Sequence, residues 1–435
     1  MKIKAAIYTL GCKVNQYESE AIAEYLENNG AEICHGVSEA DVCIINTCTV
    51  TAESDRKCRQ IIRRAKKQNP GAVILVTGCY SQVSPDEIKK IEGVDYISGN
   101  GSKLEVAKKA LMLAGNKQSC PLCEINDLSV IPFENISAGK SERTRAYIKI
   151  EDGCQNKCSY CIIPRARGNV RSKEFESIMT EAEKLSENGY HELVLTGIEV
   201  CAYGKDLRDN KTLPDVMKAI DEKNLFDRIR LGSMDPSYIK PAFTDKICNL
   251  KSTAPHFHLS LQSGCDKTLF AMKRRNNTAM VREYVEYMRT KIQSVEFTAD
   301  IIVGFPGETE EDFETTCNFV KEIGLFDAHV FAYSKRKDTV AAEMKEQVDE
   351  QTKSRRSEIL ISICKELKKN KLEKYAKDGG VFSVLFETGG EGKAVGRLAN
   401  FIEIEVPCQN DVSNQIHNVR ITGISGERLT GEFAE

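Results

Sequence analysis

Six short apolar segments between residues 143 and 345 constrain the fold of this chain more than any other feature. They read RAYIKIED, HELVLTGI, RIRLGSM, FHLSLQS, EFTADIIVGF and DAHVFAYS. Between them lie segments with helical periodicity, such as ESIMTEAEKLSENG, LPDVMKAIDE, AMVREYVEYMRTKI and EEDFETTCNFVKEIG. Regular alternation of strand and helix predicts parallel strands joined by right-handed crossovers. We therefore expect residues 143–345 to adopt an α/β fold, a partial (βα)6 parallel barrel.

The N-terminal region, residues 1–130, shows the same alternation on a smaller scale. AAIYTL precedes NQYESEAIAEYLENNG, DVCIINT precedes ESDRKCRQIIRRAKKQ, and AVILVTG precedes SPDEIKKIEG. This pattern predicts a small open α/β sheet. Residues 131–142 resemble a linker, and residues 346–378 form a basic helical connector to a last region, residues 379–435.

Composition indicates a cytoplasmic chain that uses its cysteines for metal ligation. The chain has 435 residues, a net charge of -3 and 17 cysteines. Its N-terminus lacks a signal-peptide pattern, and no apolar stretch is long enough to cross a membrane. Because the cytoplasm keeps thiols reduced, we expect metal sites rather than disulfides. Cys120 and Cys123 form a C-P-L-C pair, which is either two incidental thiols or half of a zinc site; its role stays open.

Three cysteines stand where the N-terminal strands should end: Cys12, Cys48 and Cys79. In an open parallel sheet, ligands bind at the carboxyl ends of the strands, so these thiols can converge in space. Small neighbours such as Gly11 and Gly78 would let a bulky ligand approach the backbone. We favour a shared site, although strand-end cysteines also occur by chance.

A second trio lies on the loop after the first strand of the predicted barrel, in EDGCQNKCSYCIIP: Cys154, Cys158 and Cys161. A structural zinc site needs four protein ligands, and no further cysteine or histidine follows until His191. Three thiolates around a four-iron cluster instead leave one iron open to a small molecule. Zinc completed from a distant part of the chain is the alternative.

The second trio and its flanks, KIEDGCQNKCSYCIIPRARGNVRS, resemble the radical S-adenosylmethionine enzymes, in which Tyr160 would be the typical aromatic residue before the third cysteine. Within them, TLGCKVNQYESE, NTCTVT and VTGCYSQ resemble the N-terminal domain of the methylthiotransferases. The flanks GCKVNQYESE and RTRAYIKIEDGC are most similar to the threonylcarbamoyladenosine tRNA subfamily. The resemblance covers essentially the whole chain.

This resemblance implies two [4Fe-4S] clusters, one on each trio, and S-adenosylmethionine as cofactor. It implies a 5′-deoxyadenosyl radical that activates carbon 2 of N6-threonylcarbamoyladenosine next to the tRNA anticodon, and insertion of a methylthio group there. All six cysteines, Cys12, Cys48, Cys79, Cys154, Cys158 and Cys161, would then be catalytic. The implied partners are the tRNA anticodon stem-loop, an electron donor and a sulfur source, with neither DNA nor a membrane.

The same resemblance implies which residues hold S-adenosylmethionine across the top of the barrel. Besides Tyr160, they come from the segments LTGIEV, HLSLQSG and IIVGFPGE: Thr196, Gly197, Glu199, Ser260, Gln262 and Gly304. Taken alone each signal is weak, because Gly304 also reads as a turn glycine at the end of a strand.

Residues 379–435 contain short strand-like runs, VFSVLFE, GKAVGRL, FIEIEVP and NVRITGIS, which resemble the TRAM module, a small antiparallel RNA-binding β-barrel. This stretch holds few basic residues, so bulk charge cannot bind phosphate. We expect RNA contacts from Arg397 and, beside the second trio, from Arg165, Arg167 and Arg171. Two basic helices add charge: DRKCRQIIRRAKKQ and the connector. Each charge run also reads as a solvated helix face.

Three other functions stay open. The enzyme could act on isopentenyladenosine in tRNA, or on an aspartate of a ribosomal protein, as sister subfamilies do. A non-catalytic zinc or redox-storage protein would bind zinc and leave S-adenosylmethionine intact. No residue decides between the two tRNA substrates on physical grounds.

Overall fold

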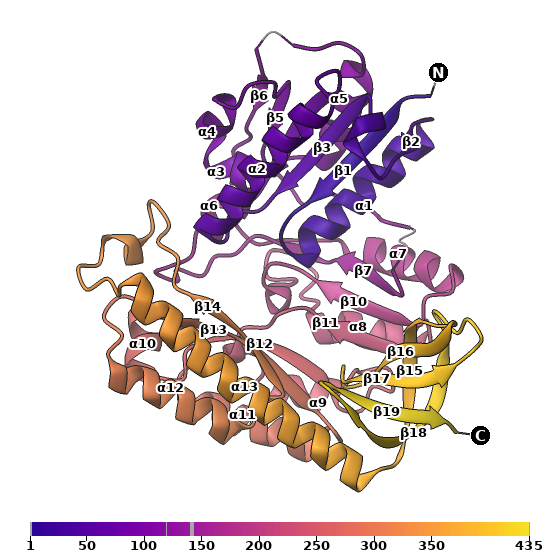
Figure 1. Cartoon of the computed structure of the whole chain (residues 1–435), viewed down its shortest axis with the longest axis vertical. Helices are drawn as coiled ribbons and strands as arrows, with labels where there is room; N and C mark the ends of the chain where they lie inside the picture. Colours follow the sequence, from indigo (N-terminus) through magenta and orange to yellow (C-terminus); the bar gives the residue numbers. More distant parts are fainter. Residues whose placement is uncertain (1, 119, 140–142, 435) are drawn as a thin grey trace.

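The computed structural model describes residues 2–118, 120–139 and 143–434, so the end of the predicted linker, residues 140–142, lies outside the described residues. Three units meet in Figure 1: an N-terminal α/β sheet, a central partial barrel and a C-terminal β-barrel. Among the described residues, no helix has the length and apolar character that a membrane crossing requires.

The N-terminal unit is a six-stranded parallel sheet in the order β2-β1-β3-β4-β5-β6. Its strands are β1 (Lys4–Thr9), β2 (Glu32–Ile33), β3 (Val42–Thr47), β4 (Val73–Gly78), β5 (Tyr96–Ser98) and β6 (Leu122–Glu124). The helices are α1 (Lys13–Asn28), η1 (Val37–Glu39), α2 (Ala52–Gln68), α3 (Cys79–Val83), α4 (Pro85–Lys89) and α5 (Lys103–Leu113). Helices α1 and α5 cover one face, and α2, α3 and α4 cover the other.

Both faces of this sheet are covered, which explains its sequence pattern. Every residue of β3 and β4 is buried, so these strands are continuous β-branched and apolar runs, as parallel strands between helices usually are. The predicted open sheet is confirmed. The short strands β2, β5 and β6 were not predicted, because two- or three-residue strands carry no periodicity. The helix α5 was not predicted either.

The central unit contains all six predicted strands, in two parallel three-stranded sheets of order β11-β10-β7 and β12-β13-β14. They are β7 (Arg145–Lys149), β10 (Glu192–Thr196), β11 (Arg228–Leu231), β12 (His256–Gln262), β13 (Glu296–Val303) and β14 (Asp327–Ala332). Parallel bridges from Ile229 to Thr253 and from Met234 to Leu259 join the two sheets. Together they form the predicted partial barrel.

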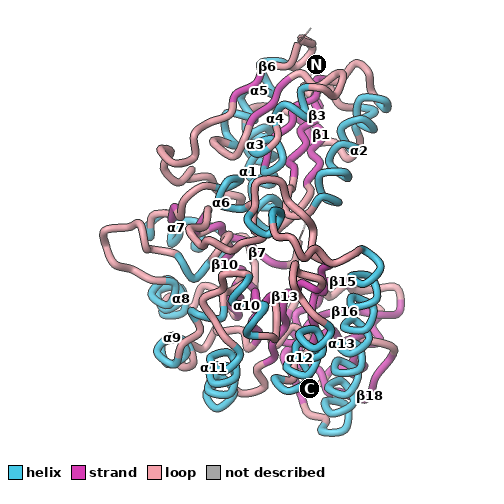
Figure 2. The backbone as a smooth tube through the Cα atoms, turned by 90° about the vertical axis from the view of Figure 1, so that its left-hand side faces the viewer, coloured by secondary structure: helices cyan, strands magenta, loops and turns pink. Residues whose placement is uncertain are grey.

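Helices cover the outside of this barrel, and Figure 2 shows α8, α9 and α11 along one side. They are α7 (Phe175–Glu187), α8 (Leu213–Glu222), α9 (Pro241–Ile247), α10 (Asp266–Ala271), α11 (Thr278–Lys291) and α12 (Glu310–Ile323). The loops carry the antiparallel pair β8 (Glu151–Asp152) and β9 (Arg171–Ser172), the helix α6 (Ile163–Arg167), and the 3-10 turns η2 (Val200–Ala202), η3 (Pro236–Tyr238) and η4 (Val340–Glu343).

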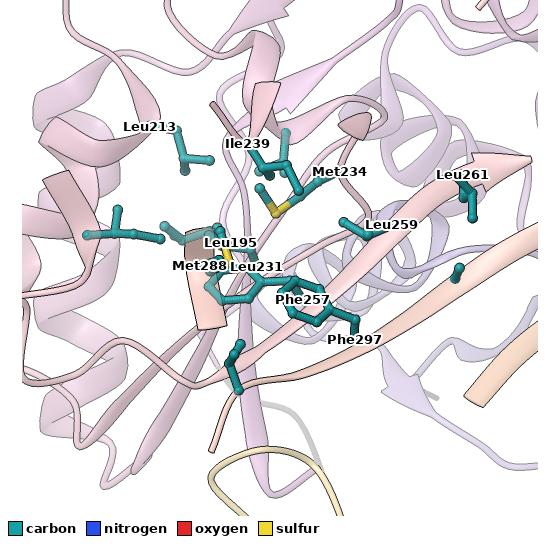
Figure 3. Packing of buried hydrophobic residues seen from close by; sticks show 14 of the residues in the cluster. Leu195, Leu213, Leu231, Met234, Ile239, Phe257, Leu259, Leu261, Met288 and Phe297 are labelled. Carbon is teal, nitrogen blue, oxygen red and sulfur yellow. The ribbon is translucent and has the colours of Figure 1, made fainter. Parts of the chain in front are cut away.

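Side chains alternate across the barrel strands, so the two faces of the barrel wall differ in polarity. In β12, Phe257 and Leu259 are buried in the core under the helices, where they pack near Phe297 of β13 (Figure 3). Their neighbours His256 and His258 lie on the opposite face, which lines the lumen. The partial barrel therefore has an apolar outer layer and a polar interior.

The segment after the barrel forms one long helix, α13 (Glu350–Asp378), which runs along the lower front of Figure 1. It leads into a closed five-stranded barrel in the order β15-β16-β17-β19-β18. The strands are β15 (Val381–Thr388), β16 (Gly392–Leu398), β17 (Glu403–Cys408), β18 (Ile416–Ser425) and β19 (Arg428–Phe433). This barrel is antiparallel except for the pair β17–β19, which is parallel.

Candidate active site

A cavity of about 1830 Å³ lies where the three units meet. The N-terminal unit contributes Cys12 and Cys48 to its lining, and the barrel strands contribute lumen residues such as His258. Residues of the C-terminal barrel, including Arg397 and Phe401, also line it. A substrate in this cavity would therefore touch all three units at once.

The N-terminal trio lies at the carboxyl ends of three neighbouring strands. Cys12 is the N-cap residue of α1 after β1, Cys48 follows β3, and Cys79 is the first residue of α3 after β4. A Cβ atom on Gly11, whose φ is +106°, would lie 2.8 Å from the Cβ of Cys48, so the loops approach as closely as only glycine allows. The predicted convergence of these three strand ends is what the structure shows.

Burial favours the protonated thiol of Cys12 and of Cys48 in the absence of a metal. It raises the pKa of Cys48 to about 11, with a further contribution from the nearby Cys79, and it raises the pKa of Cys12 as well. A bound metal centre would supply the positive charge that deprotonates them. A thiol with a raised pKa is a poor nucleophile without a metal, so Cys48 suits metal ligation better than direct reaction.

Polar groups hold the trio in place. The Asn15 amide donates to the carbonyl of Leu10 at 2.7 Å and to that of Thr47 at 3.0 Å, which ties together the loops that carry Cys12 and Cys48. Nε of Arg167 donates to Sγ of Cys79 at 3.2 Å. The Asn100 amide donates to the same sulfur at 3.4 Å.

Arg167 belongs to α6, directly after the second trio, where its sequence position predicts an RNA contact. That prediction is wrong for this structure, because the Arg167 side chain is fully buried and pairs with Glu18 and Asp152. Arg171 is also buried, where it donates to the carbonyl of Leu128 at 3.1 Å and faces Asp152 at 3.6 Å. Proximity in sequence to the trio does not place these guanidiniums on the surface.

The second trio lies on the loop between β8 and α6. The φ of Gly153 is +89°, and a Cβ there would lie 2.0 Å from the carbonyl oxygen of Asn169, so only glycine fits before Cys154. The amide of Cys154 donates to the carbonyl of Gly168 at 3.0 Å, and the amide of Ile163 donates to Sγ of Cys161 at 3.4 Å. Burial raises the pKa of both thiols to about 12.

Arg274 contacts this trio, although the sequence did not single it out. Its Nη1 donates to Sγ of Cys158 at 3.5 Å, and its Nη2 contacts the carboxylate of Asp235 at 2.9 Å. Nη2 also donates to the carbonyl of Ser260 at 2.7 Å. Tyr160 packs nearby in a cluster with Met272, Phe305, Tyr333 and Ala341.

The spacing of the sulfur atoms bears on which metal the trios suit. Among the described residues, only His258, Asp300 and His329 form a group whose potential ligand atoms all lie within 4.8 Å of one another. The sulfurs of each cysteine trio are therefore spread more widely. Four ligands at about 2.3 Å around one zinc ion would bring sulfurs within about 4 Å of one another. Neither trio is therefore gathered as tightly as the ligands of one zinc ion in this structure.

The Cys120–Cys123 pair gains no further ligand among the described residues. Cys120 is exposed, and Cys123 lies in the edge strand β6.

The residues predicted to hold S-adenosylmethionine lie at the carboxyl ends of the barrel strands. Thr196 and Gly197 line the cavity. Glu199 is buried, and burial together with the nearby Asp235 raises its pKa to about 8. Gln262 stands at a register shift of β12 with a φ of +72°. Ser260 lies two residues earlier in the same strand, half-buried, with its carbonyl bound to Arg274.

The surroundings of Gly304 differ from those expected of a glycine that contacts the adenine of S-adenosylmethionine. Its φ is +70°, and a Cβ there would lie 2.4 Å from the side chain of Lys353 on α13. The space in front of this glycine is occupied by a lysine of the same chain, so the structure does not leave it open for adenine.

Two of the predicted RNA contacts remain accessible. Arg165 is half-exposed and pairs with Asp338 at 2.5 Å. Arg397 lies at the floor of the cavity, where it pairs with Glu387 at 3.0 Å and Glu403 at 2.8 Å. To bind a phosphate, each guanidinium would therefore have to release a carboxylate of this chain with which it is now paired.

A three-cysteine loop above a partial parallel barrel defines the class of the protein as a radical S-adenosylmethionine enzyme. The Radical SAM superfamily model matches residues 148–320, and the model described as Uncharacterized protein family UPF0004 matches residues 4–99. A radical S-adenosylmethionine methyltransferase, TsrM, from Kitasatospora setae has a similar fold, with a TM-score of 0.57 and 14% identity over 79% of this chain and 77% of that one.

Similarity along the whole chain narrows the class. The chain is 37% identical to the threonylcarbamoyladenosine tRNA methylthiotransferase MtaB of Bacillus subtilis (strain 168), over 98% of this chain and 96% of that protein. It is 34% identical to the tRNA-2-methylthio-N(6)-dimethylallyladenosine synthase of Carboxydothermus hydrogenoformans, over 96% of both. The chain belongs to the radical S-adenosylmethionine methylthiotransferase family. Membership implies a [4Fe-4S] cluster and S-adenosylmethionine.

Proposed function

We propose that this enzyme inserts a methylthio group at carbon 2 of N6-threonylcarbamoyladenosine next to the anticodon of tRNA. The observation that carries the proposal is the hydrogen bond that links the loop after the second trio to a cysteine of the N-terminal trio. Arg167 lies six residues after Cys161, and its guanidinium binds Sγ of Cys79. Relatives named for this reaction and similar over the full chain support the substrate.

We infer that Cys154, Cys158 and Cys161 hold the radical-forming [4Fe-4S] cluster, and that Cys12, Cys48 and Cys79 hold a second one. The wide sulfur spacing and the buried cations around Cys79 support this assignment. When bound, the clusters and S-adenosylmethionine supply the radical that activates the base and the methylthio group that it receives.

The chain's own residues have three tasks in this reaction. The walls of the cavity shield a reactive base from water. Arg274 orients Cys158 and pairs with Asp235, while Thr196, Gly197 and Glu199 offer polar groups to S-adenosylmethionine beside them. Arg167 and Asn15 fix the loops of the second trio. In each case a buried hydrogen bond sets a position before the substrate arrives.

We propose that the tRNA enters over α2 and the C-terminal barrel. A base in an anticodon loop can leave its stack at little cost, which suits a cavity that only a flipped base can reach. Arg165 and Arg397 are the proposed contacts from the trio loop and the cavity floor. We assign residues 1–130 to the second cluster, 143–345 to the radical chemistry, and 379–435 to RNA binding. The setting is the cytoplasm, with an electron donor and a sulfur source as partners.

Anaerobic reconstitution tests the proposal directly. We expect two clusters by iron and sulfide analysis, and 2-methylthio-threonylcarbamoyladenosine in hydrolysates of hypomodified tRNA. Cys158→Ala should abolish 5′-deoxyadenosine formation. Cys48→Ala should preserve it and block methylthiolation. Methylthiolation by the Cys48 variant would refute the assignment of the second site.

The same assay separates the rival substrates. Activity only on isopentenyladenosine would make this enzyme similar in function to the dimethylallyladenosine synthases. Methylthiolation of a ribosomal protein, with no modified nucleoside formed, would place this enzyme with the subfamily that acts on a ribosomal aspartate. Tightly bound zinc with intact S-adenosylmethionine would refute the enzymatic function.

A further inference from the structure

Several lysine and arginine side chains lie in or near the lumen of the barrel, and the proposed reaction gives them no role. If carbon 2 of an adenine faces the cysteine trios, its N6 substituent points away from them, because carbons 2 and 6 lie across the six-membered ring. The substituent then extends into the lumen between Arg230, His258 and Phe401, which line the same cavity as Cys12. The chemistry of these side chains therefore determines which N6 substituent the enzyme accepts.

Lys13 stands directly after Cys12 and lines this cavity. In the part of the chain that the structure describes, its ammonium has neither a hydrogen-bond nor an ion-pair partner. It lies close enough to Arg230, Arg145 and Asp300 to feel their charges. An unpaired ammonium that lines a cavity can bind an anionic group of a ligand in that cavity.

Behind Lys13, three guanidiniums share one buried carboxylate. Arg230 contacts Glu192 at 2.7 Å, Arg145 contacts it at 2.8 Å, and Arg228 lies 3.7 Å from it. The Nη1 atom of Arg230 is buried and has no hydrogen-bond partner among the described residues. One carboxylate cannot neutralise three cations, even though Arg145 also pairs with Glu387.

The surroundings respond to this excess of positive charge. The pKa of Arg228 falls to about 10, because burial and the neighbouring Arg230 and Arg145 outweigh the attraction of Glu192. His256 stays neutral: burial, and then Arg230, His258 and Lys13, lower its pKa well below the usual value.

Asp300 also lines the cavity here, and its carboxylate is already paired. Asp300 contacts His258 at 3.1 Å and His329 at 3.2 Å. The Phe401 ring lies over Arg230, with 4.6 Å between the guanidinium carbon and the ring centroid, and stacks on His256 at 5.0 Å. The ring shields the arginine from bulk water, which strengthens its field within the cavity.

We propose that Lys13 and Arg230 bind the carboxylate of an amino-acid group carried on N6 of the substrate adenine, and so select threonylcarbamoyladenosine over adenosines with an apolar N6 group. This inference rests on the proposed function. An isopentenyl group in the same place would leave the cations unpaired and desolvated, whereas a carboxylate gains charge-assisted hydrogen bonds from both.

The test uses the anaerobically reconstituted holoenzyme and three anticodon stem-loop RNAs. The target adenosine carries threonylcarbamoyl, its threonyl methyl ester, or isopentenyl, and kcat/KM for methylthiolation is measured by mass spectrometry. We expect the wild-type enzyme to prefer the acid over the neutral ester by roughly ten- to hundredfold. Lys13→Met should remove most of this preference, and Lys13→Arg should retain it.

Controls separate specificity from general RNA affinity. Lys57→Met removes a cation at the rim of the same cavity and should leave the acid-to-ester ratio unchanged. Arg230→Gln, checked for iron content, should lower the ratio as Lys13→Met does. Equal rates on acid and ester by the wild-type enzyme, or an unchanged ratio in Lys13→Met, would overturn the inference while methylthiolation itself persists. Absence of methylthioadenosine from all three RNAs would overturn the proposed function and this inference together.

Discussion

Glu199 is a carboxylic acid that the fold keeps neutral near pH 7. Burial and Asp235 raise its pKa to about 8, against 4.5 in an unfolded chain. Its contribution to folding is fully present below pH 4.5 and is lost as the pH rises toward 8, because the unfolded chain releases its proton first.

Glu199→Gln should therefore stabilise the metal-free protein at pH 8 but not at pH 5. The neutral amide avoids the ionisation penalty, and the gain at pH 8 should reach a few kcal/mol, since each pKa unit is worth about 1.4 kcal/mol. Urea unfolding at the two pH values measures it, with the exposed Glu222→Gln as control. An equal difference at both pH values would contradict the prediction. If Glu199 binds the amino group of S-adenosylmethionine, the variant should also bind this cofactor more weakly.

Arg167→Met should weaken folding and, if the proposed second cluster is held by Cys12, Cys48 and Cys79, should weaken that cluster as well. The substitution leaves Glu18 and Asp152 with fewer buried partners, which costs about 3–5 kcal/mol, and Arg167→Lys should cost less. Loss of the N–H donor to Cys79 should move the reduction potential of that cluster to more negative values. Unfolding and redox titrations followed by electron paramagnetic resonance measure the two effects. The control is Arg165→Met, and a stability equal to that control would refute the structural role.

At this scale the cysteines were predictable and the arginines were not. Cys12, Cys48 and Cys79 each follow an apolar run, so strand ends could be read locally. The burial of Arg167 depends on Glu18, which lies 149 positions away in the chain. The polar lumen did leave a signal in HFHLSLQS, where His256, His258 and Ser260 alternate with apolar residues.

The helix α2 carries basic side chains beside the cavity. Its N-terminal end lines the mouth of the cavity through Thr51, Ser54 and Lys57. Arg56 pairs with Glu53 and Arg59 with Glu87. Further along, Arg63, Arg64 and Lys67 are exposed and have no ion pair within the described residues.

Replacing Arg63 and Lys67 by Gln should weaken tRNA binding without changing the preference for a modified base. Every phosphate that the variant can no longer bind should lower the slope of log affinity against log salt by about 1. Binding of the holoenzyme to the stem-loop at several salt concentrations measures the slope. The matched control is the double Gln variant of Lys218, on the outer helix α8, and Lys223, the C-cap residue of that helix. An unchanged slope in the α2 variant would mean that this face is merely solvated.

Element prediction succeeded where periodicity was long and failed where it was short. The barrel strands and helices such as α8 (Leu213–Glu222) follow clear patterns of buried residues. The short helix α10 and the strand β19, which closes the C-terminal barrel, were missed because their runs are brief and mixed in polarity. The parallel pairing of β17 with β19 depends on barrel closure and has no local signal.

In the whole molecule, chemistry depends on how the N-terminal unit sits on the barrel. Asp55 of α2 pairs with Arg336 at 2.7 Å, and both side chains are nearly buried. The hydroxyl of Thr49, next to Cys48, donates to the same carboxylate at 2.6 Å. The pair joins residues 281 positions apart, so no local pattern could predict it. It anchors the loop that carries Cys48 to the loop that follows β14.

Asp55→Asn should therefore uncouple the formation of 5′-deoxyadenosine from the methylthiolation of the base. Without the ionic contact the Cys48 loop is held less firmly, so the distance between the cysteine trios varies while each trio keeps its own ligands. We expect 5′-deoxyadenosine to form at close to the wild-type rate and methylthioadenosine to fall roughly tenfold, because small errors in placement cost a radical reaction heavily. The ratio of the two products in one anaerobic reaction measures the coupling. Asp86→Asn, which alters an exposed pair with Lys89 within the N-terminal unit, should leave the ratio unchanged. A parallel fall of both products would mean that the pair supports folding rather than alignment.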